Sequence, residues 1–264
     1  MALLRELADL TKKAPLRGAF LLSTSLLFFD LHAHGCAPCD SALLEVAYVH
    51  DGDTLGLKDG RKLRLIGVNT PELGQGAAAE PGALAARQLL EELVSRSGGR
   101  VRLCLDAERR DRYGRTLAHL YDHRGESINR QLLKQGAGYH IAVPPNLRNL
   151  RCYRDAERQA RKDLGGVWDH PIGDAAELRG NESGFRILRG RVARVGKSRS
   201  GLWLNLEGGL ALRITWDDWE RFDIEDPDHL LHAGVEVRGW LYQRERRQRI
   251  RVRHPASIRW LEWH

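Results

Sequence analysis

The sequence has no apolar run long enough to cross a membrane, and it is short of acidic residues. Its longest apolar run, residues 18–29, covers about 12 residues, whereas a membrane-spanning helix needs about 20. Lys and Arg number 42 against 35 Asp and Glu, so the net charge is +7. This excess favours an anionic partner, such as nucleic acid, acidic lipid or polysaccharide. Hydrophobic residues at 42% and charged residues at 29% indicate a globular chain and exclude a disordered one.

Cysteine is also scarce, with four residues in the chain: Cys36, Cys39, Cys104 and Cys152. Their spacings match no common zinc motif, and no βαβ pattern surrounds the Cys-x-x-Cys pair, so a zinc centre and a redox centre are both disfavoured. In an oxidising compartment four thiols allow three disulfide pairings. The sequence leaves the choice between these pairings, and free thiols, open.

The N-terminus has the pattern of an export signal. Lys12 and Lys13 precede the apolar run at 18–29, and the small residues Ala33 and Gly35 follow it. This order of basic, apolar and small residues is typical of a signal peptide. It predicts a periplasmic or secreted protein, or a membrane-anchored one if the signal is not cleaved. The alternative interpretation is a buried N-terminal helix.

Short β-patterned runs and three helical patterns predict a mainly β fold with some α-helix. The expected strands are 44–49, 55–58, 62–68, 100–106 and 115–122, and the expected helices are 81–95, 126–136 and 146–164. Asp59-Gly60 is typical of a hairpin turn, and Gly165-Gly166 ends the last helix. The simplest arrangement of these elements is a small β-barrel with helices packed around it.

The predicted domain organisation has four parts: a signal peptide at 1–35, a catalytic domain at 42–169, a polar linker at 170–184 and a second domain at 185–264. In the last part short β-runs return without long helices, which suits a second five-stranded barrel such as an OB-fold. Between residues 184 and 264, sixteen Lys and Arg face eleven Asp and Glu. Most of the excess positive charge therefore lies in the second domain.

One stretch of the second domain, RQRIRVRH, has an arginine at every second position. On a strand this spacing puts Arg247, Arg249, Arg251 and Arg253 on one face and the apolar side chains on the other. The aromatic residues nearby in sequence are Trp203, Trp216, Trp240 and Tyr242. Guanidiniums beside aromatic rings predict nucleic-acid binding, whereas the alternative is a solvated face with tryptophans in the core.

Three polar stretches of the first domain supply chemistry: DGDT from residue 51, RLIGVNTPE from residue 64 and RRDRYGR from residue 109. Arg64 lies within an otherwise apolar strand, where a charge needs a partner. Together the stretches provide oxygen ligands for a hard cation, a spare carboxylate and two guanidiniums. This combination suits phosphodiester hydrolysis, because a divalent cation and arginines both stabilise negative charge on phosphate.

In this order, and followed by a helix that ends in Gly and Trp, the three motifs resemble those of the thermonuclease, or staphylococcal nuclease, family over about residues 44–168. The resemblance implies a five-stranded OB-like barrel with three helices, in agreement with the elements expected above. It also implies Ca²⁺-dependent cleavage of DNA and RNA that leaves 3′-phosphate ends.

The resemblance assigns roles by motif position. The Ca²⁺ ligands would be Asp53, Asn69 and the backbone carbonyl of Thr70, with Asp51 just outside them. Glu72 would be the general base, Arg64 and Arg115 would bind the scissile phosphate, and Tyr113 would contact a nucleotide phosphate. Asn69 stands where the family has a second aspartate, so weaker metal binding is expected.

The first hypothesis is therefore an exported, monomeric, Ca²⁺-dependent nuclease whose basic second domain holds the DNA or RNA substrate. The second is a non-catalytic nucleic-acid-binding module that keeps the nuclease fold, to which Asn69 points. A third, polysaccharide binding by the second domain, rests on positive charge alone. Only Tyr139 remains of the family's tyrosine-rich stretch, so base preference is not predicted.

Overall fold

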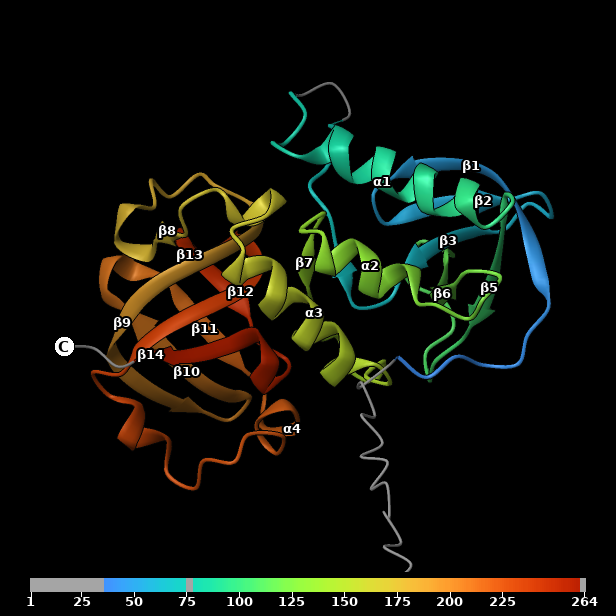
Figure 1. The fold of residues 1–264 in the computed structure, drawn as a ribbon. Helices are drawn as coiled ribbons and strands as arrows, with labels where there is room; N and C mark the ends of the chain where they lie inside the picture. The colour runs from blue at the N-terminus through green and yellow to red at the C-terminus, as the bar shows by residue number, and fades with distance from the viewer. Residues whose placement is uncertain (1–35, 75–77, 262–264) are drawn as a thin grey trace, which may run out of the picture. The chain divides into compact units, whose positions relative to one another are not determined.

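The first half of the chain folds into a five-stranded barrel with three helices (Figure 1). The structure is a computed structural model that describes residues 36–74 and 78–261, so the expected signal peptide at 1–35 lies outside the described residues. The strands are β1 (Leu43–Asp51), β2 (Thr54–Leu57), β3 (Lys62–Leu65), β5 (Arg100–Cys104) and β6 (Thr116–Tyr121). The helices are α1 (Ala83–Arg96), α2 (Ile128–Lys134) and α3 (Leu150–Lys162). A short pair, β4 (Val68–Asn69) and β7 (Tyr139–His140), lies outside the barrel.

The barrel closes in the strand order β1-β2-β3-β6-β5, with β1 pairing on both sides and β3 parallel to β6. Alternation of side chains sets its interior: in β3, Leu63 and Leu65 are buried whereas Lys62 is exposed. Over the residues that the structure describes, no helix is long and apolar enough to cross a membrane.

The second half forms another ring of strands. These are β9 (Gly184–Ser198), β10 (Gly201–Leu206), β11 (Ala211–Ile214), β12 (Gly234–Arg244) and β13 (Arg247–Arg251), with β8 (Gly173–Asp174) and β14 (Ile258–Leu261) at the edges. The order is β9-β10-β11-β13-β12, and β12 pairs back onto β9. The short helix α4 (Trp216–Trp219) follows β11. One 3-10 turn, η1 (Gly166–Trp168), follows α3, and four more lie before or between the strands of the second ring: η2 (Ala175–Glu177), η3 (Glu207–Gly209), η4 (Pro227–Leu230) and η5 (Pro255–Ser257).

The two rings share one topology. When the five strands of each ring are numbered along the chain, their order around the ring is 1-2-3-5-4, and strands 3 and 5 are parallel. This is the topology that an OB-type barrel needs, so the predicted fold class is confirmed. Each ring has its own apolar core, one centred on Leu55, Leu63 and Leu120 and the other on Leu202, Leu212 and Val237. The domain boundaries at 42–169 and 185–264 remain predictions; within the expected linker, β8 pairs with β9.

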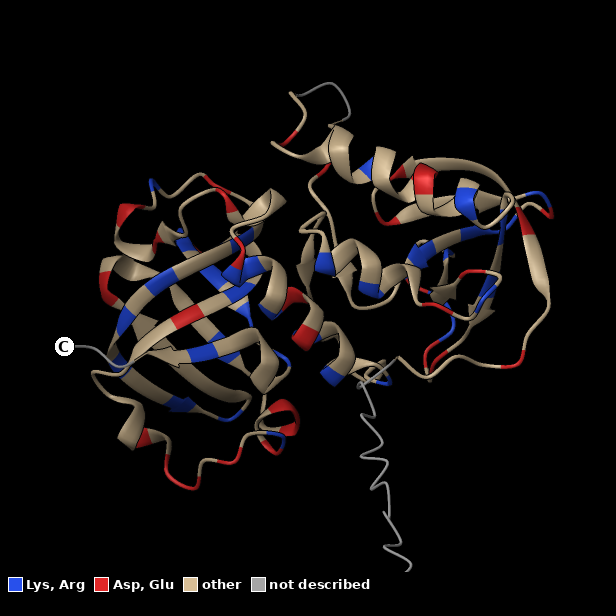
Figure 2. Cartoon of the chain, viewed as in Figure 1, with Lys and Arg blue, Asp and Glu red and all other residues tan. Residues whose placement is uncertain are grey.

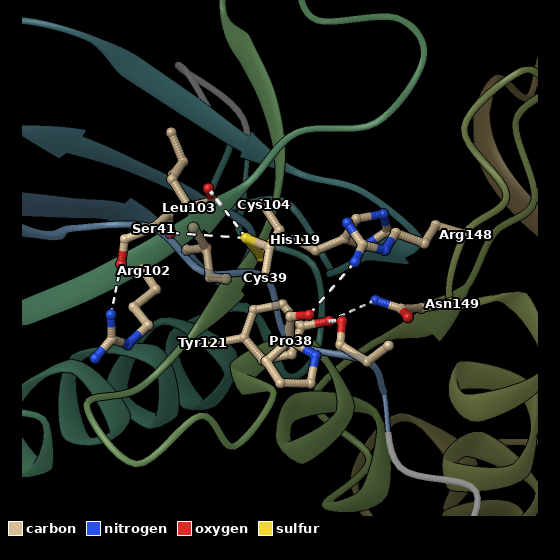
Figure 3. The surroundings of a disulfide bond; sticks show 12 residues. Pro38, Cys39, Ser41, Arg102, Leu103, Cys104, His119, Tyr121, Arg148 and Asn149 are labelled. Carbon is tan, nitrogen blue, oxygen red and sulfur yellow. Dashed lines mark hydrogen bonds between the residues drawn. A yellow bond between two sulfur atoms is a disulfide. The ribbon is translucent and has the colours of Figure 1, made fainter.

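Two disulfide bonds, Cys36–Cys152 and Cys39–Cys104, join the segment before β1 to α3 and to the end of β5. The Cys39–Cys104 bond lies beside Tyr121 (Figure 3). The Tyr121 hydroxyl donates to the carbonyl of Ala37 at 2.6 Å and accepts from Asn149 Nδ2 at 2.8 Å. The disulfide pairing of Cys36 with Cys152 and of Cys39 with Cys104 is one of the three pairings that the sequence left open.

Candidate active site

The acidic turn between β1 and β2 is held closely against α1. The backbone N–H of Asp53 donates to Asp51 Oδ1 at 3.0 Å, which fixes the turn locally. Gly52 is required because a Cβ there would lie 2.6 Å from Ala86 Cβ and 2.8 Å from Thr70 Cγ2. The turn therefore presses Asp53 inward, and this carboxylate is only 3% exposed.

Asp53 is surrounded by donors. Its Oδ1 accepts from the Thr54 hydroxyl at 3.0 Å, and its Oδ2 accepts from the Thr70 N–H at 2.9 Å. Oδ2 also forms an ion pair with Arg64 Nη2 at 2.9 Å. Burial raises the pKa of Asp53 to about 6 in spite of the attraction to Arg64. The ionised carboxylate thus needs a neighbouring positive charge.

Arg64 provides this positive charge from β3. Its Nη1 donates to the carbonyls of Leu65 and Val68 at 3.1 and 2.7 Å, and its Nη2 donates to Asn69 Oδ1 at 3.1 Å. The charged residue that interrupts the apolar strand therefore has the partner that the sequence analysis required. The Asp53 and Asn69 oxygens converge on one cationic nitrogen.

The donor set around Arg64 fits a hard divalent cation. Asp53, predicted to be a ligand from the first motif, is brought together with Asn69 and Thr70 of the second by the Asp53–Thr70 hydrogen bond and by the shared Arg64 nitrogen. All their donor atoms are oxygens, as Ca²⁺ and Mg²⁺ prefer. In the described parts of the chain no three His, Cys, Asp or Glu side chains are clustered to hold a metal, so a cation here would need amide and carbonyl oxygens besides the Asp53 carboxylate.

Glu72 lies in the loop before α1 and is exposed to solvent. Its backbone N–H donates to Glu80 Oε2 at 3.0 Å, and its carbonyl accepts from the Glu80 N–H at 2.9 Å. Partial desolvation is the main cause that raises the pKa of Glu72, and Asp51 raises it further, while Arg64 and Arg115 oppose the increase. These side chains therefore lie close enough to Glu72 to act on its charge. Glu80 was not expected from the sequence.

Arg115 is held by a turn between β5 and β6. Asp111 Oδ1 accepts from the N–H groups of Tyr113 and Arg115 at 2.9 and 3.0 Å, and Asp111 Oδ2 accepts from Arg115 Nε at 2.7 Å. Gly114 has φ +79°, which this turn requires. The Tyr113 ring is 68% exposed and stands 5.5 Å from the Arg115 guanidinium. Asp111 is a positioning residue to which the sequence analysis assigned no role, although its spacing to Arg115 could have indicated one.

A hollow of about 410 Å³ adjoins Asn69 and Thr70. Three aromatic residues line it: Tyr139, Trp168 and Phe185. The Tyr139 ring is stacked on Phe185 at 5.5 Å and meets Trp168 edge-on at 5.1 Å. The candidate cation site thus has an aromatic surface beside it.

The four arginines of RQRIRVRH alternate with the buried residues Gln248, Ile250 and Val252, as the sequence analysis expected. Three of the four have partners within the protein. Arg249 pairs with Glu245 at 2.9 Å, Arg251 pairs with Asp218 at 3.0 Å, and Arg253 donates to the carbonyl of Pro144 at 2.8 Å. The Arg247 side chain forms no hydrogen bond or ion pair with any described residue. The strand therefore does not present four equivalent free cations.

Basic residues follow the strands of this second barrel, and acidic residues concentrate in its loops (Figure 2). Among the described residues from 184 onward, Glu236 is the one acidic residue within a strand. The strand faces therefore carry the excess positive charge.

Comparisons with known proteins agree with the geometry of the first barrel. Residues 62–170 match the family described as "Staphylococcal nuclease homologue". The chain is 35% identical to the thermonuclease of Staphylococcus intermedius over 128 residues, 47% of this chain and 74% of that protein. It is 31% identical to the thermonuclease of Staphylococcus hyicus over 140 residues, 52% and 81% of the two chains. It is 34% identical to endonuclease YncB of Bacillus subtilis over 124 residues, 45% and 57% of the two chains.

The first barrel is thus that of a nuclease, a phosphodiester-cleaving enzyme that acts on nucleic acid. The chain belongs to the staphylococcal nuclease family. The family match ends at residue 170, so the role of the second barrel must be argued from its own residues.

Proposed function

We propose that this nuclease is exported and hydrolyses DNA and RNA in a Ca²⁺-dependent reaction. Asp53, Asn69 and the Thr70 carbonyl hold the cation, with Asp51 just outside them. The proposal rests on one observation: the Asp53 and Asn69 oxygens converge on Arg64 Nη2, and Glu72 lies within the electrostatic influence of Arg64 and Arg115. Bound Ca²⁺ would offset negative charge that builds on the phosphate.

Glu72 acts as the general base that removes a proton from the attacking water. Its side chain is exposed, so water can reach it, and its backbone is fixed by two hydrogen bonds to Glu80. Asp111 directs Arg115, which donates paired hydrogen bonds to the phosphate oxygens. Tyr113, exposed beside Arg115, contacts a neighbouring phosphate. Cleavage leaves a 3′-phosphate.

Arg64 has two tasks that exclude each other. Its Nη1 and Nη2 atoms already serve four oxygen acceptors, two of which belong to Asp53 and Asn69. A guanidinium has only one further N–H, on Nε, so a paired contact with phosphate requires Arg64 to release acceptors. Release of the Asp53 and Asn69 oxygens frees the Nη2 donors for the phosphate and the oxygens for the cation.

Export is supported by the signal-like pattern and by the two disulfide bonds, which persist in oxidising compartments. Intact mass spectrometry of the chain expressed in a secreting host tests it. Loss of about 35 N-terminal residues together with the mass of two disulfides is expected. Retention of the full N-terminus with four free thiols would contradict export.

The catalytic assignment is tested with plasmid, single-stranded DNA and RNA in Ca²⁺, Mg²⁺ or a chelator. Glu72→Gln keeps the shape of the side chain but removes the base, so cleavage should fall roughly 10²- to 10⁴-fold. Arg115→Lys should also reduce it, since the paired hydrogen bonds are lost. The control is Glu91→Gln, an exposed acid of α1 paired with Arg87. Chelator-resistant cleavage, or full activity in Glu72→Gln, would overturn the assignment.

The 3′-phosphate is tested on the products. They should resist extension by a polymerase until a phosphatase has removed the terminal group. Products that are extended without phosphatase would contradict the proposed position of bond cleavage.

A further inference from the structure

One face of the second barrel carries a tryptophan among arginines, beside a hollow of about 320 Å³. We call this hollow the Trp203 groove and define it by Arg194, Lys197, Trp203, Asn205, Arg247 and Arg249. It extends across β9, β10, β11 and β13. Its residues lie outside the segment that matches the nuclease family.

The strand register explains why the groove is open. Trp203 pairs with Gly196 on one side, and Asn205 pairs with Ala211 on the other. Neither Gly196 nor Ala211 fills the space next to the indole. Even a Cβ added at Gly196 would lie 3.8 Å from Trp203 Cβ, which is an ordinary contact distance. The Trp203 Nε1 donates to Ser198 Oγ at 3.3 Å, so one edge of the ring is anchored. The sequence thus provides an oriented aromatic ring with free volume beside it.

The positive charge around Trp203 is only partly neutralised. Lys197 pairs with Asp228 at 2.9 Å, as Arg249 does with Glu245. Arg194 and Arg247, in contrast, form no ion pair with any residue in the described ranges. No acidic residue lines the groove. An anion that enters it would therefore meet the Arg194 and Arg247 guanidiniums without displacing a carboxylate.

Two further guanidiniums lie against the indole. The Arg249 and Arg213 guanidiniums are 5.1 and 5.8 Å from the Trp203 ring centre. The Nε atoms of both arginines are buried and have no hydrogen-bond partner. Bases stack on aromatic rings and on guanidinium planes alike, and this cluster offers both.

The groove continues into a second hollow of about 480 Å³. The two hollows share Arg194, Asn205 and Arg247, and the second adds Arg179 and Arg246. The second hollow also has no acidic lining residue. The basic surface is therefore elongated, as a chain-like polyanion requires.

We propose that the Trp203 groove binds single-stranded nucleic acid, with a base stacked at Trp203 and backbone phosphates along Arg194 and Arg247. A duplex does not offer an unpaired base, and an acidic polysaccharide or lipid surface has no planar ring for the indole. The inference rests on the nucleic-acid substrate of this nuclease but not on its proposed catalytic residues. Attachment through the groove would raise the local concentration of substrate at the first barrel.

The test measures binding of fluorescein-labelled dT12 by anisotropy, with chelator present and with Glu72→Gln in every chain. Trp203→Ala should weaken binding about 5- to 100-fold, because one stacked base is lost. Trp203→Phe should retain most of the affinity. Arg247→Ala should lower the slope of log affinity against log salt by about 0.7. The matched controls Trp260→Ala on β14 and Arg191→Ala on β9, neither of which lines the groove, should change little.

Three results would overturn the inference. The first is binding of dT12 within twofold of the parent in Trp203→Ala, with an unchanged melting curve. The second is that the parent binds a 12-base-pair duplex as tightly as dT12. The third is that Trp203→Ala weakens binding of inorganic polyphosphate by the same factor as binding of dT12. Cleavage by the Glu72→Gln chain would instead refute the catalytic proposal and leave the binding comparison intact.

Discussion

Glu236 gives the most quantitative prediction that the structure allows. This carboxylate on β12 is 3% exposed and accepts from the guanidiniums of Arg161, Arg189 and Arg259. Burial alone would raise its pKa, but hydrogen bonds from Arg161 and Arg259, and their charges, outweigh burial and lower the pKa to about 2. The ordinary value is 4.5. The folded protein therefore holds Glu236 in its charged form.

The shift converts into a pH-dependent stability. The difference between 4.5 and about 2, at about 1.4 kcal/mol for each pH unit, corresponds to about 3.5 kcal/mol of folding free energy. Because the folded pKa lies below the unfolded one, this contribution is fully present above pH 4.5. It is lost as the pH falls through 4.5 toward 2. At neutral pH, Glu236→Gln should therefore destabilise the chain by about 3.5 kcal/mol, in the range for breaking a buried ion pair.

Urea unfolding at several pH values between 2.5 and 7, followed by tryptophan fluorescence, measures this effect. The deficit of Glu236→Gln relative to the parent should shrink as the pH falls below 4.5. Glu207→Gln, an exposed acid in the η3 turn, is the control and should change stability little at any pH. A Glu236→Gln chain that is as stable as the parent at pH 7, or a deficit that does not vary with pH, would refute the reasoning.

Three other perturbations have clear expected outcomes. Replacing either disulfide by serines should cost about 4–5 kcal/mol by loop-closure entropy, since the bonds span 116 and 65 residues, and calorimetry with and without reductant checks this. Gly52→Ala should lower the free energy of unfolding by about 1–3 kcal/mol and reduce cleavage, because the added Cβ would collide with Ala86 and Thr70. Gly165→Ala, whose added Cβ would have its nearest neighbouring atom at 3.8 Å, is the control, and both variants are compared by melting curve and cleavage assay. Asp111→Asn should lower kcat/KM roughly 10- to 100-fold by releasing Arg115, whereas Asp59→Asn in the exposed hairpin should not; equal activity of the two would contradict the positioning role.

The sequence predicted the elements well where a local signal sets them. The helix expected at 126–136 is observed as α2, and Ser127 caps it by accepting from the Arg130 N–H at 3.2 Å. The strand expected at 62–68 stops at Leu65 instead. Gly67, with φ +80°, turns the chain where a Cβ would lie 2.5 Å from Tyr153, a contact that only the folded protein reveals.

Side-chain partners far apart in the chain were beyond local patterns. The last helix was expected to run over 146–164, yet α3 ends at Lys162, and Leu164 has φ +51° and is 65% exposed. The partner of Arg251 is Asp218, which lies 33 residues away in the sequence. The alternation of side chains along the strand correctly predicted the face that Arg251 occupies. It could not predict that Asp218 neutralises Arg251, because the position of Asp218 depends on how α4 packs.

A comparison of the two barrels explains why they take different proposed roles. In the first, the pairing of the second and third strands places Thr54 opposite Arg64; in the second, it places Trp203 opposite Arg213. Arg64 of the first barrel forms an ion pair with the buried Asp53 carboxylate, so a cation and an anion lie side by side in the candidate active site. The arginine of the second barrel has no ion pair with a described residue and lies against an indole, which suits binding of an anion with a planar base. The same strand topology therefore supports the proposed catalytic role where this arginine is paired with a buried carboxylate, and the proposed binding role where the arginine lies against an indole.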